Sequence, residues 1–400
     1  MATNLAVIGA QWGDEGKGKI VDYYTESAQV VVRYAGGPNA GHTLVVGDDK
    51  LVVRLLPSGI LRPTTKCILG QGMVIDAKVL LGEIDQLTER GFGDLGSRLM
   101  LSDRAHMIFP YHLTIDALRE TALGQSKAIG TTKKGIGPAY EDKARRTGIR
   151  AGDLADLNRL TELIEAALEA WRPTLKALGG DSPSARAIVD ELAPLLDIDH
   201  GTYPFVTSSS AVAGGATIGA GIGPSRIDCV VGITKAYTTR VGSGPFPTEQ
   251  DDAAGKHLRD VGVEFGSVTG RPRRTGWLDL PALRYARRVN GLDGLALTKL
   301  DVLTGLDRVR ICVAYDTPAG RVDELPIDLI DRPGLATPVY RDFDGWTEPL
   351  SGARRLDDLP PAARRYLDFL ESGAEVPLYL VSVGPRRAET IELRHPFAGN

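Results

Sequence analysis

Short apolar segments alternate with amphipathic segments along most of the chain. Continuous apolar runs predict strands at Leu5–Gly9, Gln29–Tyr34, Cys67–Leu69, Cys229–Val231, Leu295–Leu297, Arg310–Tyr315 and Leu378–Val383. Apolar residues spaced three or four apart predict helices at Ala77–Arg90, Leu113–Leu123 and Leu280–Val289. Apolar runs that alternate with helices are typical of a mostly parallel sheet buried on both faces. The pattern therefore predicts an α/β fold with a large, mostly parallel central sheet flanked by helices.

The longest helical pattern covers Asp153–Leu178, with apolar residues three or four positions apart from Leu157 to Trp171. A glycine pair, Gly179-Gly180, and a polar stretch follow it, as is typical of a helix end. We interpret the region of about 153–195 as a helical excursion from the sheet. No repeat, low-complexity tail or flexible linker interrupts the chain, so a single domain over residues 1–400 is expected.

Composition excludes several classes of protein. Hydrophobic residues at 42% and charged residues at 24% are ordinary globular values and exclude a disordered chain. A net charge of −4 argues against a general nucleic-acid binder. The three cysteines, Cys67, Cys229 and Cys312, lie in apolar segments, which favours buried thiols over a disulfide framework or a zinc site. No signal-peptide pattern and no membrane-spanning apolar run is present, so a cytoplasmic protein without a membrane partner is expected.

Glycine is over-represented, with 47 of 400 residues against a typical share of about 7%. The first predicted strand runs into a loop containing Gly9, Gly13, Gly16 and Gly18, and a helix is predicted from about Lys19. Loop amides, a helix N-terminus and a lysine together bind phosphates. The spacing is neither GxxxxGK[ST] nor a GxGxxG followed by a ribose-binding acid, which argues against a dehydrogenase. A nucleotide phosphate site is favoured over a purely structural loop.

Two further features point to chemistry at this end of the sheet. Asp14 and Glu15 lie inside the glycine loop, where an acid beside phosphates indicates a bound metal or a proton to be abstracted. A solvated loop tip is the alternative. A second loop, Ala35–Thr43, follows the next predicted strand and places His42 between glycine and threonine. Because sites in α/β proteins open at the carboxyl ends of parallel strands, we favour a functional histidine there over a structural one.

Taken together, these motifs resemble the adenylosuccinate synthetase family, the GTP-dependent enzymes that join IMP and L-aspartate. The resemblance runs nearly end to end and rests on ordered motifs, which are Gln11–Lys19, Asn39–Thr43, Gly130–Thr132 with Gly135–Lys143, Leu196–Pro204, Val206–Ser209, Lys235–Glu249 and Thr298–Asp301. It implies a variant P-loop GTP-binding fold with helical and loop excursions.

The resemblance also implies a two-step reaction through 6-phosphoryl-IMP, giving adenylosuccinate, GDP and phosphate. The catalytic residues it implies are Asp14 as the base for N1 of IMP, His42 as a donor to the transferred phosphoryl group, and Lys17. Mg²⁺ is the implied cofactor, held by Asp14 and the carbonyl of Gly41. The implied GTP-binding residues are Gly13, Glu15, Gly16, Lys17, Gly18, Thr43, Lys299 and Asp301.

For the other substrates, the implied IMP-binding residues are Asn39, Thr132, Arg146, Thr207, Val241 and Arg271, and the implied aspartate-binding residues are Thr269, Arg271 and Arg273. Arg146 matches an arginine that the family supplies from the neighbouring subunit, which implies a homodimer with shared sites.

The sequence departs from the family pattern in three places. A Glu-Gly-(Ala/Ser)-Gln-Gly loop is expected where this chain has Ile188–Pro194, and Leu192 stands near the position of its glutamine. Lys133-Lys134 replaces the usual Gly-Arg, and lysine cannot copy the arginine fork. In the arginine-rich segment Val268–Arg274, Val268 replaces a threonine and Pro272 interrupts the arginines.

These departures leave alternatives to IMP ligation open. One is a paralogue that carries out the same chemistry on another 6-oxopurine nucleotide, as in a phage or nucleoside-antibiotic pathway. Another is a catalytically silent GTP-binding protein, although the presence of both Asp14 and His42 argues against it.

Overall fold

The computed structural model describes residues 3–11, 13, 15–38, 42–46, 49–92, 95–123, 131–155, 157–180, 212–240, 245–265, 272–326 and 334–397. For residues 42–46, 49–51, 155, 157 and 158 it describes the backbone alone. The chain divides into two compact units, Met1–Ile20 with Ser225–Asn400 (the first unit) and Val21–Pro224 (the second unit). The division falls inside helix α1 (Lys17–Thr25).

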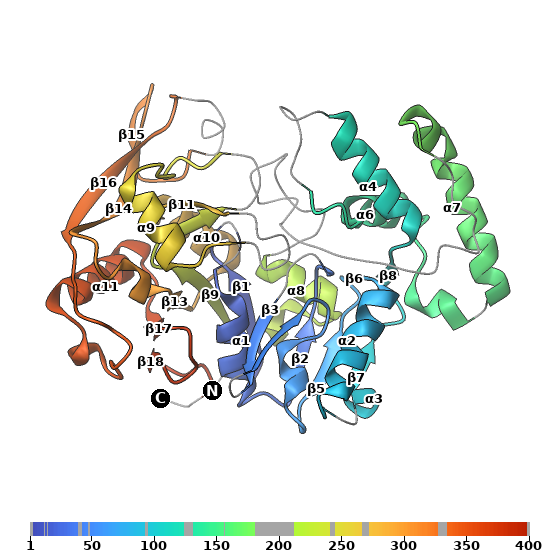
Figure 1. The fold of residues 1–400 in the computed structure, drawn as a ribbon, viewed down its shortest axis with the longest axis horizontal. Helices are drawn as coiled ribbons and strands as arrows, with labels where there is room; N and C mark the ends of the chain where they lie inside the picture. The colour runs from blue at the N-terminus through green and yellow to red at the C-terminus, as the bar shows by residue number, and fades with distance from the viewer. Residues whose placement is uncertain are drawn as a thin grey trace. The chain divides into compact units, whose positions relative to one another are not determined.

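The first unit is organised by a five-stranded sheet (Figure 1). In sheet order its strands are β1 (Leu5–Gly9), β9 (Cys229–Lys235), β13 (Gly294–Thr298), β17 (Leu378–Ser382) and β18 (Thr390–Glu392). The first four strands pair in parallel, and β18 is antiparallel to β17. Strands β9, β13 and β17 are buried at every position, as expected for a sheet covered on both faces. The predicted mostly parallel sheet is confirmed.

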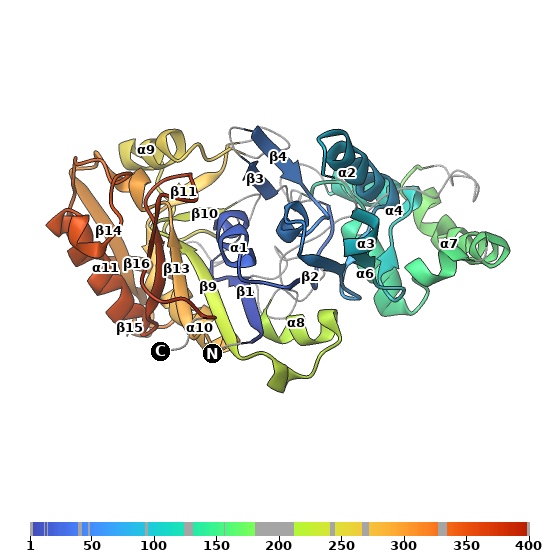
Figure 2. The ribbon, with the colours of Figure 1, turned by 90° about the horizontal axis from the view of Figure 1, so that it is seen from below.

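Smaller strands and helices complete the first unit. A second sheet contains β12 (Leu278–Asp279), β14 (Arg308–Thr317), β15 (Gly320–Val322) and β16 (Thr337–Asp344), and an antiparallel pair contains β10 (Thr238–Arg240) and β11 (Arg274–Gly276). The helices are α9 (Ala253–Val261), α10 (Leu280–Asn290), α11 (Pro361–Ala374) and the 3₁₀ turns Leu300–Leu303 and Leu356–Asp358. Helix α10 contacts α11 and β14 (Figure 2).

The second unit contains three small groups of strands. They are the parallel sheet β2 (Val30–Arg33), β5 (Lys66–Leu69) and β7 (Leu99–Leu101), the hairpin β3 (His42–Val46) and β4 (Asp49–Val53), and the parallel pair β6 (Val74–Ile75) and β8 (His106–Met107). Its helices are α2 (Ala77–Glu89), α3 (Leu95–Arg98), α4 (Pro110–Ala122), α6 (Ile136–Arg145), α7 (Leu157–Ala177), α8 (Ala213–Ala220) and the 3₁₀ turns Ser58–Leu61 and Ala151–Ala155; a further 3₁₀ turn, Pro224–Arg226, lies at the border of the units.

Asp142 joins three of these helices inside the second unit. Its carboxylate, on α6, accepts hydrogen bonds from Tyr111 Oη on α4 (3.2 Å) and from Trp171 Nε1 on α7 (2.9 Å). His112 Nε2 lies 2.9 Å from the same carboxylate, while its Nδ1 accepts the amide of Phe109 at 2.9 Å. Burial raises the pKa of Asp142, but these bonds outweigh burial and the net pKa is lowered. The predicted helix after Asp153 is therefore anchored through Trp171; the rest of the predicted excursion, from residue 181, lies outside the described residues.

The free cysteines are all buried, as predicted from their apolar settings. Within the part of the chain described here, no helix is both long enough and apolar enough to cross a lipid bilayer.

His106 gives the second unit a dependence on pH. It is 6% exposed, its Nδ1 has no hydrogen-bond partner among the described residues, and burial together with Lys143 and Arg150 lowers its pKa to about 4. The unfolded chain, with a histidine pKa near 6.5, therefore binds a proton first as the pH falls. Protonation then favours unfolding, so the contribution of His106 to stability is lost between about pH 6.5 and pH 4.

We expect the free energy of unfolding of the wild type to fall by about 1–2 kcal/mol more than that of His106→Asn between pH 7 and about pH 5. Urea denaturation at the two pH values measures this difference. The same pH dependence in both proteins would contradict the assignment.

Candidate active site

The glycine-rich loop after β1 is shaped by a buried carboxylate from within it. Glu15 is 1% exposed, and its Oε1 accepts hydrogen bonds from the amides of Gly13 (2.8 Å) and Gln11 (3.3 Å). Its Oε2 forms an ion pair with Lys17 Nζ. Burial raises the pKa of Glu15, but Lys17 and the loop amides outweigh burial. The net pKa is lowered, so the carboxylate stays ionised. Glu15 therefore folds the loop and tethers Lys17.

Glycines give this carboxylate its room. A Cβ on Gly9 would lie 2.6 Å from Glu15 Oε1, which is too close for any side chain. Gly13 and Gly16 have φ values of 93° and 85°, in the region that glycine adopts without strain. Helix α1 begins at Lys17, two residues earlier than predicted, so Lys17 and Gly18 lie in its first turn. Amides at such a helix start are suited to bind phosphate.

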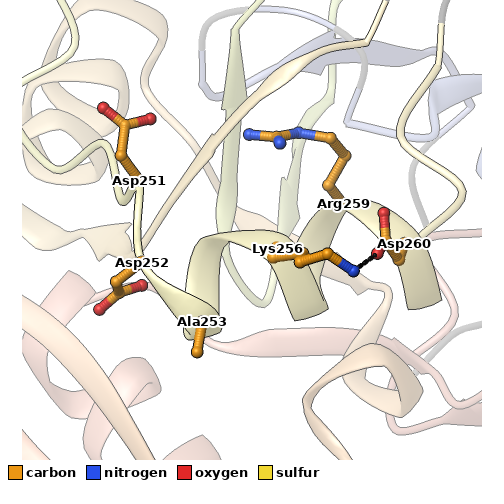
Figure 3. Close-up of a pocket in the computed structure, with 6 residues that line it drawn as sticks. All are labelled: Asp251, Asp252, Ala253, Lys256, Arg259 and Asp260. Atoms are coloured by element: carbon orange, nitrogen blue, oxygen red, sulfur yellow. Dashed lines mark hydrogen bonds and ion pairs between the residues drawn. The ribbon is translucent and has the colours of Figure 1, made fainter.

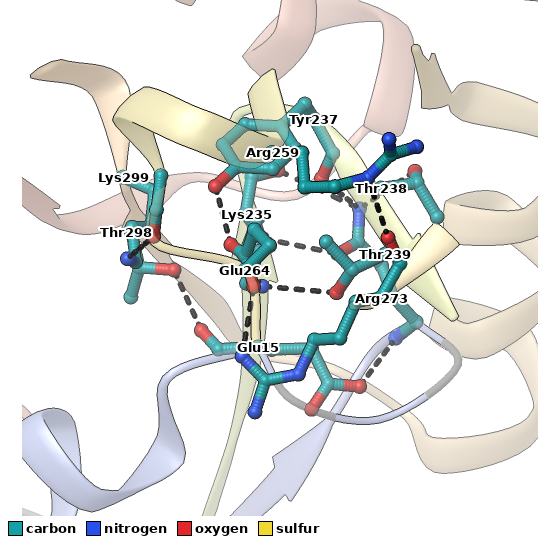
Figure 4. Close-up of polar contacts among 12 residues, drawn as sticks. Glu15, Lys235, Tyr237, Thr238, Thr239, Arg259, Glu264, Arg273, Thr298 and Lys299 are labelled. Carbon is teal, nitrogen blue, oxygen red and sulfur yellow. Dashed lines mark hydrogen bonds and ion pairs between the residues drawn. The ribbon is translucent and has the colours of Figure 1, made fainter. Parts of the chain in front are cut away.

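The end of β13 contacts the loop directly (Figure 4). Thr298, the last residue of β13, donates its hydroxyl to the carbonyl of Glu15 at 2.6 Å. Gln11 makes a similar link to β9, because its Oε1 accepts the amide of Lys235 (3.1 Å) and its Nε2 donates to the carbonyl of Tyr237 (3.3 Å). The loop after β1 is thus fixed to the carboxyl ends of β9, which pairs with β1, and of β13, the next strand of the sheet.

Two of the predicted GTP-binding residues, Lys299 and Asp301, follow Thr298. Lys299 adopts φ 64°, and its Nζ donates to the carbonyl of Gly262 at 2.7 Å. Asp301 lies in the 3₁₀ turn that follows, and burial raises the pKa of its carboxyl, while Lys299 and Lys19 lower it to a smaller extent. The side chain of Asp301 is partly shielded from water.

Lys19 and the end of β17 form a part of the site that the sequence did not reveal. Lys19 Nζ donates to Ser382 Oγ (2.7 Å) and to the carbonyls of Gly384 (2.8 Å) and Glu389 (3.1 Å). Burial lowers the pKa of Lys19 to about 8, against the attraction of Asp301 and Glu389. Ser382-Val-Gly384 matches no phosphate or base motif, so the one available signal was its position after the last predicted strand of a parallel sheet.

Two predicted residues, Thr132 and Arg146, lie in the second unit. Thr132 is exposed, in a loop whose neighbouring amides are held by α4: Thr131 donates to Glu120 (3.2 Å) and Gly135 donates to Asp116 (2.9 Å). Arg146 caps the C-terminus of α6, is exposed and has φ 67°. Both side chains are available to a ligand or to another chain. Of the Lys133-Lys134 pair, Lys133 is exposed and has φ 55°.

Arg273 is the described member of the predicted aspartate-binding set. Its Nη1 donates to the buried carboxylate of Glu264 at 2.8 Å, and its side chain is 17% exposed. Pro272 forms an isolated bridge with Phe265. The sequence had not singled out Glu264.

The other predicted site residues are either not described or described by their backbone alone. Those outside the described residues are Asp14, Asn39, Gly41, Thr207, Val241, Val268, Thr269, Arg271 and the Ile188–Pro194 segment with Leu192; His42 and Thr43 are described as backbone of β3. Among the described side chains, no three of the histidine, cysteine, aspartate and glutamate type gather to hold a metal ion. Both predicted Mg²⁺ ligands, Asp14 and Gly41, lie outside that set.

A pocket of about 420 Å³ lies elsewhere, at helix α9 (Figure 3). It is lined by Asp251, Asp252, Ala253, Lys256, Arg259 and Asp260. Three of its charged groups stabilise the helix itself: Asp252 caps the N-terminus by accepting the amide of Gly255 (3.0 Å), and Lys256 pairs with Asp260 (2.7 Å). We assign it no chemistry.

The comparisons with known proteins agree with this arrangement. The family model for adenylosuccinate synthetase matches residues 6–195 and 191–391. The adenylosuccinate synthetase of Sorangium cellulosum (strain So ce56) is 57% identical over 430 residues, covering 99% of this chain and 100% of that protein. That of Myxococcus xanthus (strain DK1622) is 52% identical and covers 98% of this chain and 99% of that protein. The aligned length of 430 exceeds the 400 residues of this chain, so the Sorangium protein contains residues with no counterpart here.

Two solved structures are similar. The fully ligated adenylosuccinate synthetase from Plasmodium falciparum has a TM-score of 0.90 and 38% identity, covering 98% of this chain and 100% of that chain. The succinoaminodeoxyadenylate synthetase of cyanophage S-2L, bound to dGMP and dATP, has a TM-score of 0.60 at 23% identity over 98% of this chain and 96% of that chain, a likeness of fold alone.

The fold and the loop after β1 define an α/β nucleotide-binding protein whose glycine-rich loop and Lys299–Asp301 segment lie at the carboxyl ends of parallel strands. The chain belongs to the adenylosuccinate synthetase family. This membership confirms the predicted class of activity, a GTP-dependent ligase of purine biosynthesis that forms a C–N bond.

Because Glu15 organises the loop, we expect Glu15→Gln to lower the free energy of unfolding by about 1–3 kcal/mol. The amide keeps the shape of the side chain but loses the charge that faces Lys17, and its NH₂ group cannot accept the hydrogen bonds. GTP affinity should fall as well. Urea denaturation and GTP titration measure the two effects.

Glu26→Gln is the matched control, because Glu26 is exposed and follows the same helix. Equal stability and equal GTP affinity in the two variants would show that Glu15 does not organise the loop.

Proposed function

We propose that this protein ligates L-aspartate to C6 of IMP with GTP as the energy donor, through a 6-phosphoryl-IMP intermediate. The observation that supports this most is the Thr298 hydroxyl bond to Glu15, since it joins the phosphate loop to the Lys299–Asp301 segment within one unit. A nucleoside triphosphate bound on the loop would then have the partly buried carboxylate of Asp301 nearby to select its base.

In the first step we assign the N1 proton of IMP to the carboxylate of Asp14. Loss of that proton makes O6 nucleophilic, so O6 forms a bond to the γ-phosphorus as the bond to GDP breaks. Lys17 and the loop amides neutralise charge on the phosphates, and His42 donates to the transferred group. In the second step the amino group of aspartate forms a bond to C6, phosphate leaves, and the nitrogen loses a proton.

Carboxylate recognition falls to the arginine-rich segment in this proposal. Thr269, Arg271 and Arg273 bind the aspartate, because a guanidinium presents a bidentate fork to carboxylates. Asn39, Thr132, Thr207, Val241 and Arg271 bind IMP, together with Arg146. Asp301 accepts from N1–H and the 2-amino group of guanine, with Lys299 beside it, and Gly13, Glu15, Gly16, Gly18 and Thr43 complete the GTP site.

Mg²⁺ is proposed as the cofactor, held by Asp14 and the carbonyl of Gly41. When bound, it neutralises phosphate charge. We also propose that residues 1–400 act as a single functional domain, in a cytoplasmic homodimer in which exposed Arg146 reaches the neighbouring site.

A second candidate is the same ligation on another 6-oxopurine nucleotide. The observation that favours it is the shortness of this chain against the aligned length of its Sorangium relative, together with leucine at position 192, near the place of the expected glutamine. Without that polar contact, IMP binding could weaken by about 1–3 kcal/mol.

A substrate panel tests the function directly. We expect the protein to form adenylosuccinate from IMP, GTP, L-aspartate and Mg²⁺, followed by absorbance, and to form less product from GMP or dGMP. Asp14→Asn cannot take the N1 proton and should give no product, which controls for contaminating enzymes. Product from dGMP but not from IMP would favour the second candidate, and GTP binding without turnover on any nucleotide would favour a silent protein.

Asp301 should set the preference for guanine. We expect Asp301→Asn to raise the KM for GTP about 10- to 100-fold. The reason is that an uncharged amide replaces the carboxylate that accepts hydrogen bonds from N1–H and the 2-amino group of guanine. The KM values for IMP and aspartate should stay within about threefold. The preference for GTP over ITP, which lacks the 2-amino group, should also fall. Asp307→Asn, at an exposed position in the same segment, is the control. An undiminished preference for GTP in Asp301→Asn would contradict base reading by Asp301.

A further inference from the structure

A buried ionic cluster lies beyond the end of β9, beside the arginine-rich segment (Figure 4). Lys235, the last residue of β9, is 1% exposed, and its Nζ donates to Glu264 Oε1 (2.7 Å) and to Thr239 Oγ1 (2.9 Å). The hydroxyl of Tyr237 also donates to Glu264 Oε1. Glu264 is fully buried. Such a carboxylate is stable only because these donors replace the water it has lost.

The other oxygen of Glu264 holds Arg273. Arg273 Nη1 donates to Glu264 Oε2 at 2.8 Å. One buried carboxylate therefore serves two cations, Lys235 and Arg273, so their positive charge is not fully balanced by Glu264. Burial lowers the pKa of Lys235 to about 8; Glu264 raises it, while Arg273 and Lys299 lower it. A cluster with this balance favours a further anion nearby.

The main chain of Glu264 and Phe265 also pairs with that of Pro272 and Arg273. The carbonyl of Glu264 accepts the amide of Arg273 at 2.9 Å, and Phe265 bridges to Pro272. Arg259 Nε adds a bond to the carbonyl of Arg273 at 3.2 Å. Glu264 thus holds both the main chain and the guanidinium of Arg273.

The turn that delivers Glu264 into the interior is strained. Val263 has φ 50°, an outlier for a β-branched residue, and is 69% exposed. Before it, Gly262 leaves room for Tyr237, since a Cβ there would lie 2.4 Å from the tyrosine hydroxyl oxygen. The carbonyl of Gly262 accepts Lys299 Nζ at 2.7 Å. Strain of this kind persists where surrounding bonds hold it, and here the buried bonds of Glu264 do so.

We propose that Glu264 is a positioning residue that orients Arg273 to bind a carboxylate of the substrate aspartate. This inference rests on the proposed function, which gives Arg273 that ligand. A guanidinium held on one side by a fixed carboxylate loses less conformational entropy when it binds a second anion. Glu264 acts through Arg273 and does not touch the substrate.

Glu264→Gln tests the proposal because it keeps the size of the side chain and removes its charge. We expect the KM for L-aspartate to rise about tenfold or more, with the KM values for GTP and IMP within about threefold. Glu264→Asp retains the charge and should recover part of the loss. Hydrogen exchange of the unliganded protein should be faster in a peptide covering residues 262–275 of Glu264→Gln.

The matched control is Glu249→Gln. Glu249 pairs with Arg274 (2.8 and 2.5 Å), the neighbour of Arg273. The Glu249→Gln substitution should therefore leave the KM for aspartate unchanged. The positioning role would be overturned if Glu264→Gln left the KM for aspartate unchanged or lowered it. It would also be overturned if that KM rose only in parallel with the KM values for GTP and IMP. The exchange measurement needs no substrate, so unchanged exchange would overturn it whatever the wild-type activity. An inactive wild type would contradict the proposed function separately.

Discussion

The parallel pairing of β1, β9 and β13 is the constraint on which the nucleotide site depends. Parallel strands bring their carboxyl ends to one edge of the sheet, so the segments that follow them become neighbours although they are far apart in the chain. Thr298 uses this proximity to reach the carbonyl of Glu15, and Gln11 uses it to reach Lys235. The conformation of the glycine-rich loop therefore depends on the sheet as well as on its own glycines.

Buried carboxylates position other groups around this edge of the sheet. Glu15 and Glu264 are buried, each accepts several donors, and each holds a cation that would otherwise be mobile, Lys17 or Arg273. Cations held in this way lose less freedom when an anionic substrate arrives, which is how a rigid site gains affinity without added contacts. Asp142, in the second unit, likewise accepts several hydrogen bonds, including those from Tyr111 and Trp171.

The sequence predicted the strands, the phosphate loop and the family, because apolar periodicity and long motifs are local signals. It did not predict the inward role of Glu15, since an acid in a phosphate loop equally suggests a metal ligand; the space left by Gly9 becomes evident only in three dimensions. Ser382 carries no motif, and its contact with Lys19 spans most of the chain. Glu264 was missed because its partner Lys235 lies 29 residues away and both appear as ordinary charged residues.

Several residues in or beside the predicted binding segments have a left-handed backbone conformation. Among the described residues, five that are not glycine have positive φ, and four of them, Lys133, Arg146, Val263 and Lys299, lie in or beside the predicted binding segments. Glycine would occupy each position without the cost of about 1–2 kcal/mol that a side chain adds. At three of these positions, Lys133, Arg146 and Lys299, that cost places a cationic group on a fixed backbone. Stabilising this protein by glycine at those positions would therefore trade fold stability against ligand contacts, and a more robust chain would be a poorer enzyme.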